Sequence, residues 1–324
     1  MRAVVVRSHG GPEVLESAEV DAPTPGAGEV LVEVAAAGVN YIDTYHRTGA
    51  YPLPLPFTPG LEGAGRVVAV GEGVTEFAVG DRVAWGNTLG SYAEHAVVPV
   101  SDAIAVPDGV DLEIAGGALL QGMTAHYLTH STYPVRQGDA VLVHAAAGGM
   151  GLALTQFVKA LGGRVIGTVS TEEKERLARE AGADEVIRYT ETDDLAAEVR
   201  RLTDGAGVAA VYDGVGATTF DASLASLRPR GVLALFGAAS GPVPPVDPQR
   251  LNAAGSVFLT RPTLKHHVAS REELTWRAGD VFRAIAEGTL TIRVGHRYPL
   301  AEAATAHADL QGRRTTGKLV LLPR

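Results

Sequence analysis

The amino-acid sequence predicts an α/β protein with two domains, a β-barrel-like domain and a domain built on a doubly wound parallel sheet. The first observation is length, because the chain has 324 residues and a typical domain has about 150. The second is a change of pattern along the chain. Short strands separated by glycine and proline fill the first third, whereas apolar strands alternate with helical segments from about Asp139 onward. Such alternation is typical of a parallel sheet with crossover helices.

The first third contains five predicted strands within a region rich in glycine and proline, and this pattern suits a compact β-barrel-like domain. The strands are Val4 to Arg7, Val30 to Ala35, Arg66 to Val70, Arg82 to Trp85 and Tyr92 to Val97.

The second part of the chain has a strand and helix rhythm that predicts βαβ units. In order, the segments are the strand AVLVHA, a helix from Gly149, the strand RVIGTV, the helix TEEKERLAREAG, and the strands DEVI, VAAVYD, GVLALFG and SVFLTRP. The tail reads as a long helix from Glu272, a strand from Leu290 to His296, a helix from Ala301 and a last strand, GKLVLLP. We expect this tail to fold back onto the first domain.

Composition excludes several classes of site. The chain has no cysteine, which excludes disulfides, a thiol nucleophile and thiolate zinc sites. The net charge of −9 argues against nucleic acid as a partner. No apolar run approaches the ~18 residues that a membrane span requires, and the N-terminal MRAVVVRSHGGPE lacks the apolar core of a signal peptide. We therefore expect a cytoplasmic protein that does not enter membranes.

A turn of small residues joins the first apolar strand of the second domain to its helix. The turn is Ala145-x-x-Gly148-x-x-Gly151, so an alanine stands at the first position of the usual G-x-G-x-x-G pattern. Small residues still let a pyrophosphate approach the backbone at the helix N-terminus. An ordinary tight turn would also carry small residues, but all the neighbouring elements fit a dinucleotide-binding unit.

The end of the second strand of this unit favours NADP(H) over NAD(H). NAD-binding proteins usually place an acidic residue there for the ribose 2′-hydroxyl, whereas this strand ends in Thr168-Val169-Ser170-Thr171. A 2′-phosphate would find hydroxyl donors and a positive charge on Ser170, Thr171, Lys174 and Tyr189. The alternative is that Lys174 is only a solvated helix residue, because Glu172, Glu173 and Glu175 surround it.

These motifs, with AGVNYIDTYHRTGAYPLPLPFTPGLEGAGRV and GDRVAWGNTLGSYAEHAVVP, resemble the quinone oxidoreductase and zeta-crystallin branch of the medium-chain dehydrogenase/reductase superfamily. The resemblance covers nearly the whole chain. It implies a GroES-like catalytic domain of residues 1–121 completed by residues 266–324, with a Rossmann NADP-binding domain of residues 122–265 inserted between them. It also implies a homodimer or homotetramer.

Zinc ligands of related dehydrogenases are replaced at all three matching positions, which are Asn40, Leu61 and Gln121. The resemblance therefore implies an enzyme without a metal site. A site made only of histidines is the alternative, since the chain has ten of them, but they are scattered apart from the adjacent His266 and His267.

The resemblance also implies the cofactor contacts. Asn40 and Tyr45 match positions beside the nicotinamide ribose and ring, and Thr124 matches a further contact. The pyrophosphate loop corresponds to Ala147, Gly148, Gly149 and Met150, before Gly151, and the 2′-phosphate pocket to Ser170, Lys174 and Tyr189. Backbone flanking the nicotinamide corresponds to Phe236, Gly237, Ala238, Ala239, Leu259, Thr260 and Arg261, with a weaker match at Gly216. Alternatively, Asn40 is a helix cap, Tyr45 a packed aromatic, and Phe236 and Leu259 core residues.

The expected chemistry is direct hydride transfer from NADPH to a quinone or related electrophile, with Asn40, Tyr45 and Tyr51 as polar groups near the acceptor oxygen. One alternative is a reductase of alkenals, enones or enoyl thioesters, in which Tyr45 or Tyr51 would supply a proton. Another is an NADPH-binding protein with little turnover, as crystallins and RNA-binding members of the group suggest. The physiological acceptor and the choice between one-electron and hydride reduction are left open by these residues.

Overall fold

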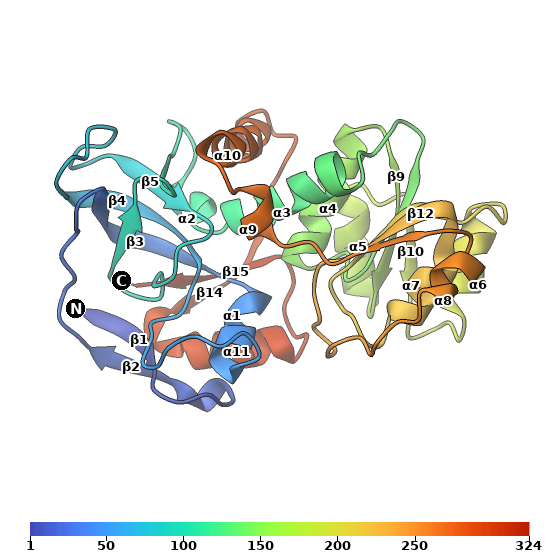
Figure 1. The fold of residues 1–324 in the computed structure, drawn as a ribbon, viewed down its shortest axis with the longest axis horizontal. Coiled ribbons are helices and arrows are strands. Elements are labelled where there is room, and N and C mark those ends of the chain that lie inside the picture. Colours follow the sequence, from blue (N-terminus) through green and yellow to red (C-terminus); the bar gives the residue numbers. More distant parts are fainter. Residues whose placement is uncertain (324) are drawn as a thin grey trace. The chain divides into compact units, whose positions relative to one another are not determined.

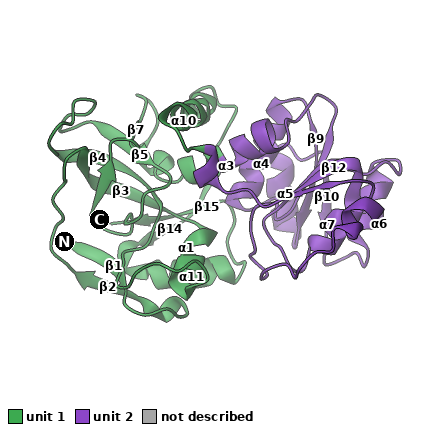
Figure 2. Ribbon diagram, in the orientation of Figure 1, with its two compact units in different colours: residues 1–123, 268–324 green, residues 124–267 purple. Residues whose placement is uncertain are grey.

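A computed structural model describes residues 1–323, and it divides into two compact units (Figure 2). Unit 1 comprises residues 1–123 and 268–324, and unit 2 comprises residues 124–267. Both boundaries lie two residues beyond the predicted ones. None of the helices in the described chain is long and apolar enough to cross a membrane.

Unit 1 is built on a mainly antiparallel seven-stranded sheet (Figure 1). Along the sheet the order is β14 (Val294–Pro299), β15 (Lys318–Leu322), β3 (Glu29–Val39), β4 (Glu62–Val70), β5 (Arg82–Trp85) and β7 (Ile104–Ala105), and β6 (His95–Pro99) also pairs with β3. β1 (Arg2–Val6) and β2 (Leu15–Glu19) form a separate antiparallel pair. Because β15 pairs with β3, the C-terminal tail completes the sheet of the first domain, as the sequence predicted.

Alternation along β3 explains the core of unit 1. Val30, Val32 and Val34 are buried on one face of the strand, and they pack with the buried Trp85 and Tyr92. Side chains of a strand point alternately to opposite faces, so every second residue from Val30 to Val34 enters the core, whereas all residues from Ala36 to Val39 are buried.

The helices of unit 1 are α1 (Tyr41–Thr48), α2 (Leu112–Ala115), most of α3 (Leu119–Tyr127), α10 (Arg271–Ala286) and α11 (Ala303–Gln311), with single 3-10 turns at Pro12–Val14 and Leu300–Glu302. α1 begins after Asn40, whose backbone N–H donates to the Asp43 carboxylate at 2.8 Å. This bond satisfies a backbone donor at the start of the helix.

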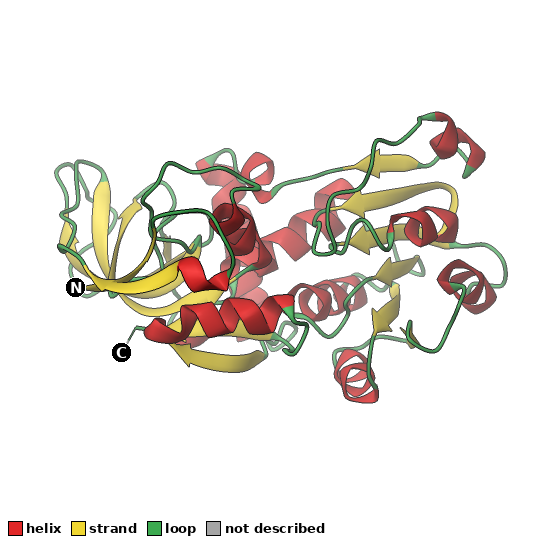
Figure 3. Cartoon of the chain, turned by 90° about the horizontal axis from the view of Figure 1, so that it is seen from below, coloured by secondary structure: helices red, strands yellow, loops and turns green. Residues whose placement is uncertain are grey.

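Unit 2 contains a six-stranded parallel sheet, and strands alternate with helices along the chain (Figure 3). The strand order is β10 (Glu185–Arg188), β9 (Arg164–Val169), β8 (Ala140–Val143), β11 (Val208–Asp213), β12 (Leu227–Leu235) and β13 (Phe258–Thr260). The helices are α4 (Gly149–Ala160), α5 (Glu172–Glu180), α6 (Leu195–Leu202), α7 (Phe220–Ser226), α8 (Gln249–Ala253) and α9 (Leu264–His267), and a π-helical turn covers Leu128–Thr132. The first strand of unit 2, β8, lies centrally in this sheet beside β11, which is the doubly wound order.

The structure adds β2 and β7, which were not predicted, and begins β4 at Glu62 rather than Arg66. Two other strands begin later than predicted. Residues Tyr92–Glu94 precede β6 because they bond elsewhere: Tyr92 N–H donates to the Pro59 carbonyl at 3.0 Å, and Ala93 forms a bridge with Ala3. The strand predicted at Leu290 begins only at Val294, since Leu290 N–H still donates to the Ala284 carbonyl at the end of α10. In both places the apolar residue at the predicted start of the strand, Tyr92 or Leu290, is buried, but its backbone N–H bonds outside the strand pairs of the sheet.

Candidate functional site

The carboxyl ends of the strands in unit 2 gather most of the predicted cofactor residues. Parallel strands end at one edge of a sheet, and ligands of doubly wound folds bind outside that edge. The residues at or just after these ends are Ala147 to Gly151 after β8, Ser170 and Thr171 after β9, Tyr189 after β10, Gly216 after β11, Phe236 to Ala239 after β12, and Leu259 to Arg261 in and after β13. Lys174 lies in the first turn of α5. Thr124 differs from them, because it lies on α3 and is buried.

The turn between β8 and α4 is held tightly against its own helix. Ala145 has a left-handed backbone with φ of 52°, the conformation that glycine adopts most readily. A Cβ on Gly151 would collide with the Ala145 carbonyl oxygen. A Cβ on Gly148 would meet only that same oxygen, at 3.3 Å, so the outer side of the turn leaves the backbone accessible to a ligand.

The ends of β9 and β10 bring the predicted 2′-phosphate residues together. Tyr189 N–H donates to the Val169 carbonyl at 3.1 Å, and Thr190 Oγ1 donates to the Ser170 carbonyl at 3.2 Å. Thr171 caps α5, with its hydroxyl accepting from Lys174 N–H. One neighbouring acid, Glu175, forms ion pairs with Arg179 and Arg188 at 3.0 and 3.2 Å, which reduces the negative charge around Lys174.

The loops after β11 and β12 pack backbone against backbone. Gly216 has φ of 93°, and a Cβ there would lie 2.8 Å from the Gly241 carbonyl oxygen. Gly237 faces Gly214 with no room for a Cβ. The contact of the two loops therefore requires glycine at positions 216 and 237, both of which were expected beside the nicotinamide.

Asn40 in unit 1 is the centre of a buried polar network. Its Oδ1 accepts from Lys318 Nζ at 2.7 Å and from Gln121 Nε2 at 3.1 Å, and its Nδ2 donates to Glu62 Oε2 at 2.8 Å. Lys318 Nζ also lies 2.6 Å from Glu62 Oε2 in a fully buried ion pair. Leu120 N–H donates to the other Glu62 oxygen at 2.7 Å. Asn40 and Gln121, two of the three positions expected to replace zinc ligands, thus contact each other.

Three tyrosine rings form an aromatic cluster at α1. The ring centroids of Tyr41 and Tyr45 are 5.7 Å apart, and those of Tyr45 and Tyr51 are 5.1 Å apart in an edge-to-face arrangement. Tyr51 is 42% exposed and Tyr45 is half-buried. Edge-to-face packing of rings with polar hydroxyls makes a surface that suits a flat ligand.

A second buried network in unit 1 was not predicted from the sequence. Arg47 Nη1 lies 3.1 Å from His307 Nδ1, His307 Nε2 lies 3.1 Å from the Tyr92 hydroxyl, and that hydroxyl donates to Asp43 Oδ2 at 2.9 Å. Burial raises the pKa of Asp43 to about 7 and lowers the pKa of His307 to about 3. Burial and the Asp43 carboxylate together raise the pKa of Tyr92. Asp43 and Arg47 lie on α1, so this network fixes the helix that carries Tyr45.

The described residues contain no group of three or more His, Cys, Asp or Glu side chains arranged to hold a metal ion. The Lys318 ammonium, which donates to Asn40 Oδ1 at 2.7 Å, has no lone pair to offer a metal.

The chain is similar to known oxidoreductases over its whole length. Residues 26–108 match the family model of the alcohol dehydrogenase GroES-like domain, and residues 149–278 match that of the zinc-binding dehydrogenases. A quinone oxidoreductase of Pseudomonas aeruginosa is 48% identical over 318 residues, covering 98% of each protein, and a 2-haloacrylate reductase of a Burkholderia species is 44% identical over 331 residues, covering 99% of each. A mycobacterial protein solved in complex with NADPH is 57% identical, with a TM-score of 0.97 and full coverage of both chains. The chain therefore belongs to the quinone oxidoreductase branch of the medium-chain dehydrogenase/reductase superfamily, as its motifs predicted.

Proposed function

We propose that the protein is a zinc-independent, NADPH-dependent reductase of quinones. The observation that carries this proposal is the arrangement of unit 2, in which the open turn at Gly148 and the hydroxyl and ammonium groups at Ser170 and Lys174 follow the ends of adjacent strands. The quinone oxidoreductase relative and the NADPH complex of the mycobacterial protein support the same assignment.

The residues of unit 2 fit a phosphorylated dinucleotide. The backbone at Gly148 is accessible beside the N-terminus of α4, where backbone N–H groups and the helix dipole favour a pyrophosphate. Ser170 and Tyr189 lie at the ends of neighbouring strands, where Tyr189 N–H donates to the carbonyl of Val169, the residue before Ser170. Lys174 adds the positive charge that a 2′-phosphate needs. The bound cofactor supplies a hydride.

On unit 1 we assign the acceptor to the cluster of Tyr45 and Tyr51. Their rings offer an apolar face to a flat acceptor, and their hydroxyls can donate to a carbonyl oxygen as negative charge develops there. A quinone demands little more, because its reduced oxygens are weakly basic and can take protons from solvent. Asn40 is less suited to this task, because its Nδ2 already donates to Glu62.

Reduction of a carbon–carbon double bond conjugated to a carbonyl is a second candidate. The 2-haloacrylate reductase relative favours it, and the same tyrosines would have to deliver a proton to carbon. The low-turnover NADPH-binding protein remains the third, and the net charge of −9 opposes an RNA-binding role for it.

Zinc independence rests on the chemistry of the Asn40 network. The buried Lys318 ammonium lies 2.7 Å from Asn40 Oδ1, and its positive charge opposes a divalent cation at that amide. Activity is therefore expected to be unchanged after incubation with a chelator. Loss of activity that only added metal restores would refute this part of the proposal.

Self-association is proposed at the edge of the sheet in unit 2, in a cytoplasmic homodimer or homotetramer. Within the described chain the edge strand β13 pairs with β12 alone, and Phe258 on β13 is 61% exposed. An exposed apolar edge strand is a template for pairing with a second copy. Light scattering of Phe258→Lys, compared with the unaltered protein, tests this placement.

The activity test is loss of NADPH absorbance with para-benzoquinone, with a simple enal and with no acceptor, each repeated with NADH. Quinone-dependent loss of NADPH supports the proposal. Turnover with the enal alone favours the second candidate, and tight NADPH binding without turnover favours the third.

Two variants test the acceptor site. Tyr51→Phe is expected to raise the KM for quinone, whereas Tyr298→Phe is the control, because the Tyr298 hydroxyl in β14 donates to Asp309 instead. Equal effects of both variants would remove Tyr51 from the acceptor site.

A further inference from the structure

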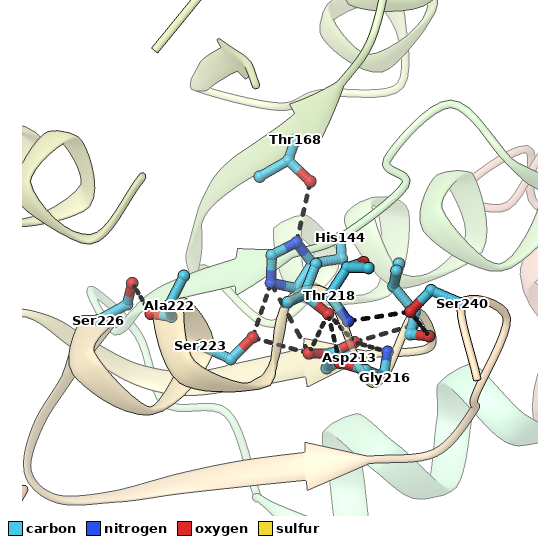
Figure 4. A network of polar contacts seen from close by, with 11 residues as sticks. His144, Thr168, Asp213, Gly216, Thr218, Ala222, Ser223, Ser226 and Ser240 are labelled. Atoms are coloured by element: carbon cyan, nitrogen blue, oxygen red, sulfur yellow. Dashed lines mark hydrogen bonds and ion pairs between the residues drawn. The ribbon is translucent and has the colours of Figure 1, made fainter. Parts of the chain in front are cut away.

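A buried polar network joins three strands and a helix beneath the carboxyl edge of the sheet in unit 2 (Figure 4). His144 follows β8, and its Nδ1 lies 3.0 Å from Thr168 Oγ1 on β9. Its Nε2 lies 2.9 Å from Ser223 Oγ on α7. Ser223 Oγ in turn donates to Oδ2 of Asp213, the last residue of β11, at 2.7 Å. All four side chains are buried.

The same three residue types form nucleophilic triads in hydrolases, in which the serine donates to the histidine. Here the hydrogen bond between these two residues has the opposite direction. The Ser223 hydroxyl donates its hydrogen bond to the Asp213 carboxylate. His144 Nε2 must therefore carry a hydrogen and donate to Ser223 Oγ. His144 Nδ1 then accepts from the Thr168 hydroxyl. Burial lowers the pKa of His144, although Asp213 opposes the shift, and the ring is neutral. Because the His144 nitrogen that faces Ser223 carries a hydrogen, it cannot take the serine proton as a triad histidine does, and Ser223 is fully buried away from any substrate. The network therefore serves to hold structure.

The Asp213 carboxylate organises the loop that follows β11. Its Oδ1 accepts from the backbone N–H groups of Val215 and Gly216 at 2.8 and 3.0 Å. Thr219 Oγ1 donates to both carboxylate oxygens, at 3.0 and 2.8 Å. One buried carboxylate thus fixes both the turn at Gly216 and the start of α7.

The other end of the network holds the turn between β8 and α4. The Thr168 carbonyl accepts from Ala146 N–H at 3.0 Å, and His144 N–H donates to the Tyr212 carbonyl at 3.2 Å. Ala145, with its left-handed backbone, lies between these two anchored residues. The strand that carries Thr168 continues directly into Ser170, a predicted 2′-phosphate residue.

We propose that His144, Ser223 and Asp213 are positioning residues for the cofactor: they hold the turn at Gly148 and the loop at Gly216 in the spacing that a dinucleotide requires, without touching it. The proposal rests on NADPH binding by unit 2, as argued above. None of the three was among the cofactor contacts expected from the sequence. Loosening such a support is expected to weaken binding of the whole dinucleotide rather than recognition of its 2′-phosphate.

The test compares two buried serines on the same helix. Ser223→Ala removes the bridge between His144 and Asp213, whereas Ser226→Ala removes only a bond to the Ala222 carbonyl within α7 (Figure 4). Dissociation constants for NADPH and NADH are measured by fluorescence titration on the full chain, well below the melting temperature of each variant. We expect Ser223→Ala to weaken both cofactors about tenfold, and Ser226→Ala to weaken neither by more than about twofold.

Steady-state kinetics with the acceptor add a readout that general destabilisation would not move. The KM for NADPH is expected to rise in Ser223→Ala, while kcat at saturating NADPH stays within about twofold of the unaltered protein. A fall of kcat with unchanged NADPH affinity would overturn the proposal, as would equal effects of the two serine variants.

Thr168→Val replaces Ser223→Ala if that variant does not fold, because valine has nearly the shape of threonine and removes only the partner of His144 Nδ1. Its control is Thr155→Val in α4, because the buried Thr155 hydroxyl has no hydrogen-bond partner in the described part of the chain. Weaker binding of both cofactors to Thr168→Val alone supports the network, and unchanged binding refutes it. Failure of the unaltered protein to bind NADPH would instead refute the proposed function.

Discussion

Replacing Asp43 with asparagine is expected to change how the stability of unit 1 depends on pH. Asp43 is fully buried, its Oδ2 accepts from Asn40 N–H and the Tyr92 hydroxyl, and its Oδ1 has no hydrogen-bond partner among residues 1–323. Burial raises its pKa from 3.8 to about 7, so the folded protein keeps a proton on Asp43 that the unfolded chain releases. An asparagine amide has the shape of this protonated acid and does not titrate.

The sign and size of the effect follow from proton linkage. The stability contributed by protonated Asp43 is complete below pH 3.8 and is lost as the pH rises through about 7. A span of about three pH units at about 1.4 kcal/mol per unit corresponds to about 4 kcal/mol. Relative to the unaltered protein, Asp43→Asn should therefore gain about 1.4 kcal/mol of stability per pH unit between about pH 4 and pH 7.

The pH dependence must be compared between the two proteins, because the titration of His307 changes the free energy of unfolding in the opposite direction to that of Asp43. Its pKa falls from 6.5 to about 3, so the stability that depends on its neutral form is lost as the pH falls through that range. The two groups largely cancel in the unaltered protein between about pH 4 and pH 6.5. Only the comparison with Asp43→Asn isolates the carboxyl.

The assay is denaturant unfolding followed by tryptophan fluorescence. Both tryptophans of the chain, Trp85 and Trp276, lie in unit 1, so the signal reports on the unit that contains Asp43. The free energy of unfolding is compared for the two proteins at several pH values between 4 and 7. A constant difference across this range would show that Asp43 is ionised in the folded protein, and would refute the reasoning.

Three further predictions concern the 2′-phosphate pocket, the Lys318 ion pair and the turn at Ala145. Lys174→Ala should weaken NADPH at least about tenfold more than NADH, because only NADPH carries the 2′-phosphate, and titrations that show equal weakening would remove Lys174 from the pocket. Lys318→Met should lower the free energy of unfolding of unit 1 by about 3–5 kcal/mol, measured by tryptophan fluorescence, since Glu62 would keep a buried charge without its cation. Ala145→Gly should increase the free energy of unfolding by up to about 1 kcal/mol and so raise the melting temperature slightly, because the φ of 52° strains alanine. A lower melting temperature would show that the strain is absent.

The fold was predictable where the signal is local. The turn between β8 and α4 combines an apolar strand, small residues and an amphipathic helix within one short stretch, and each part is legible by itself. Only the start of the strand predicted at Leu290 was wrong, because whether Leu290 pairs in the sheet or bonds back to the end of α10 depends on how the chain folds around it.

The polar networks could not be predicted because their partners are far apart in the chain. Lys318 and Glu62 are separated by 256 residues, and His307 and Tyr92 by 215. A single sequence carries no signal that a buried lysine will meet one particular glutamate across strands of the same sheet. The Ser223 bridge has the same origin, since its serine is unremarkable in the sequence of α7.

Asn40 illustrates how the structure changes the meaning of a predicted site residue. The sequence places it beside the acceptor as a polar donor and beside the cofactor as a contact, yet it is 2% exposed and its amide bonds to Lys318, Gln121 and Glu62. Its Nδ2 carries two hydrogens, which it donates to Glu62 Oε2 at 2.8 Å and to the Gly38 carbonyl at 3.4 Å, so a hydrogen bond to an acceptor would have to replace one of these buried bonds. Its backbone, meanwhile, begins α1. We therefore propose that Asn40 fixes the start of the helix that carries Tyr45, and we keep the proposal that the tyrosine hydroxyls donate to the acceptor oxygen.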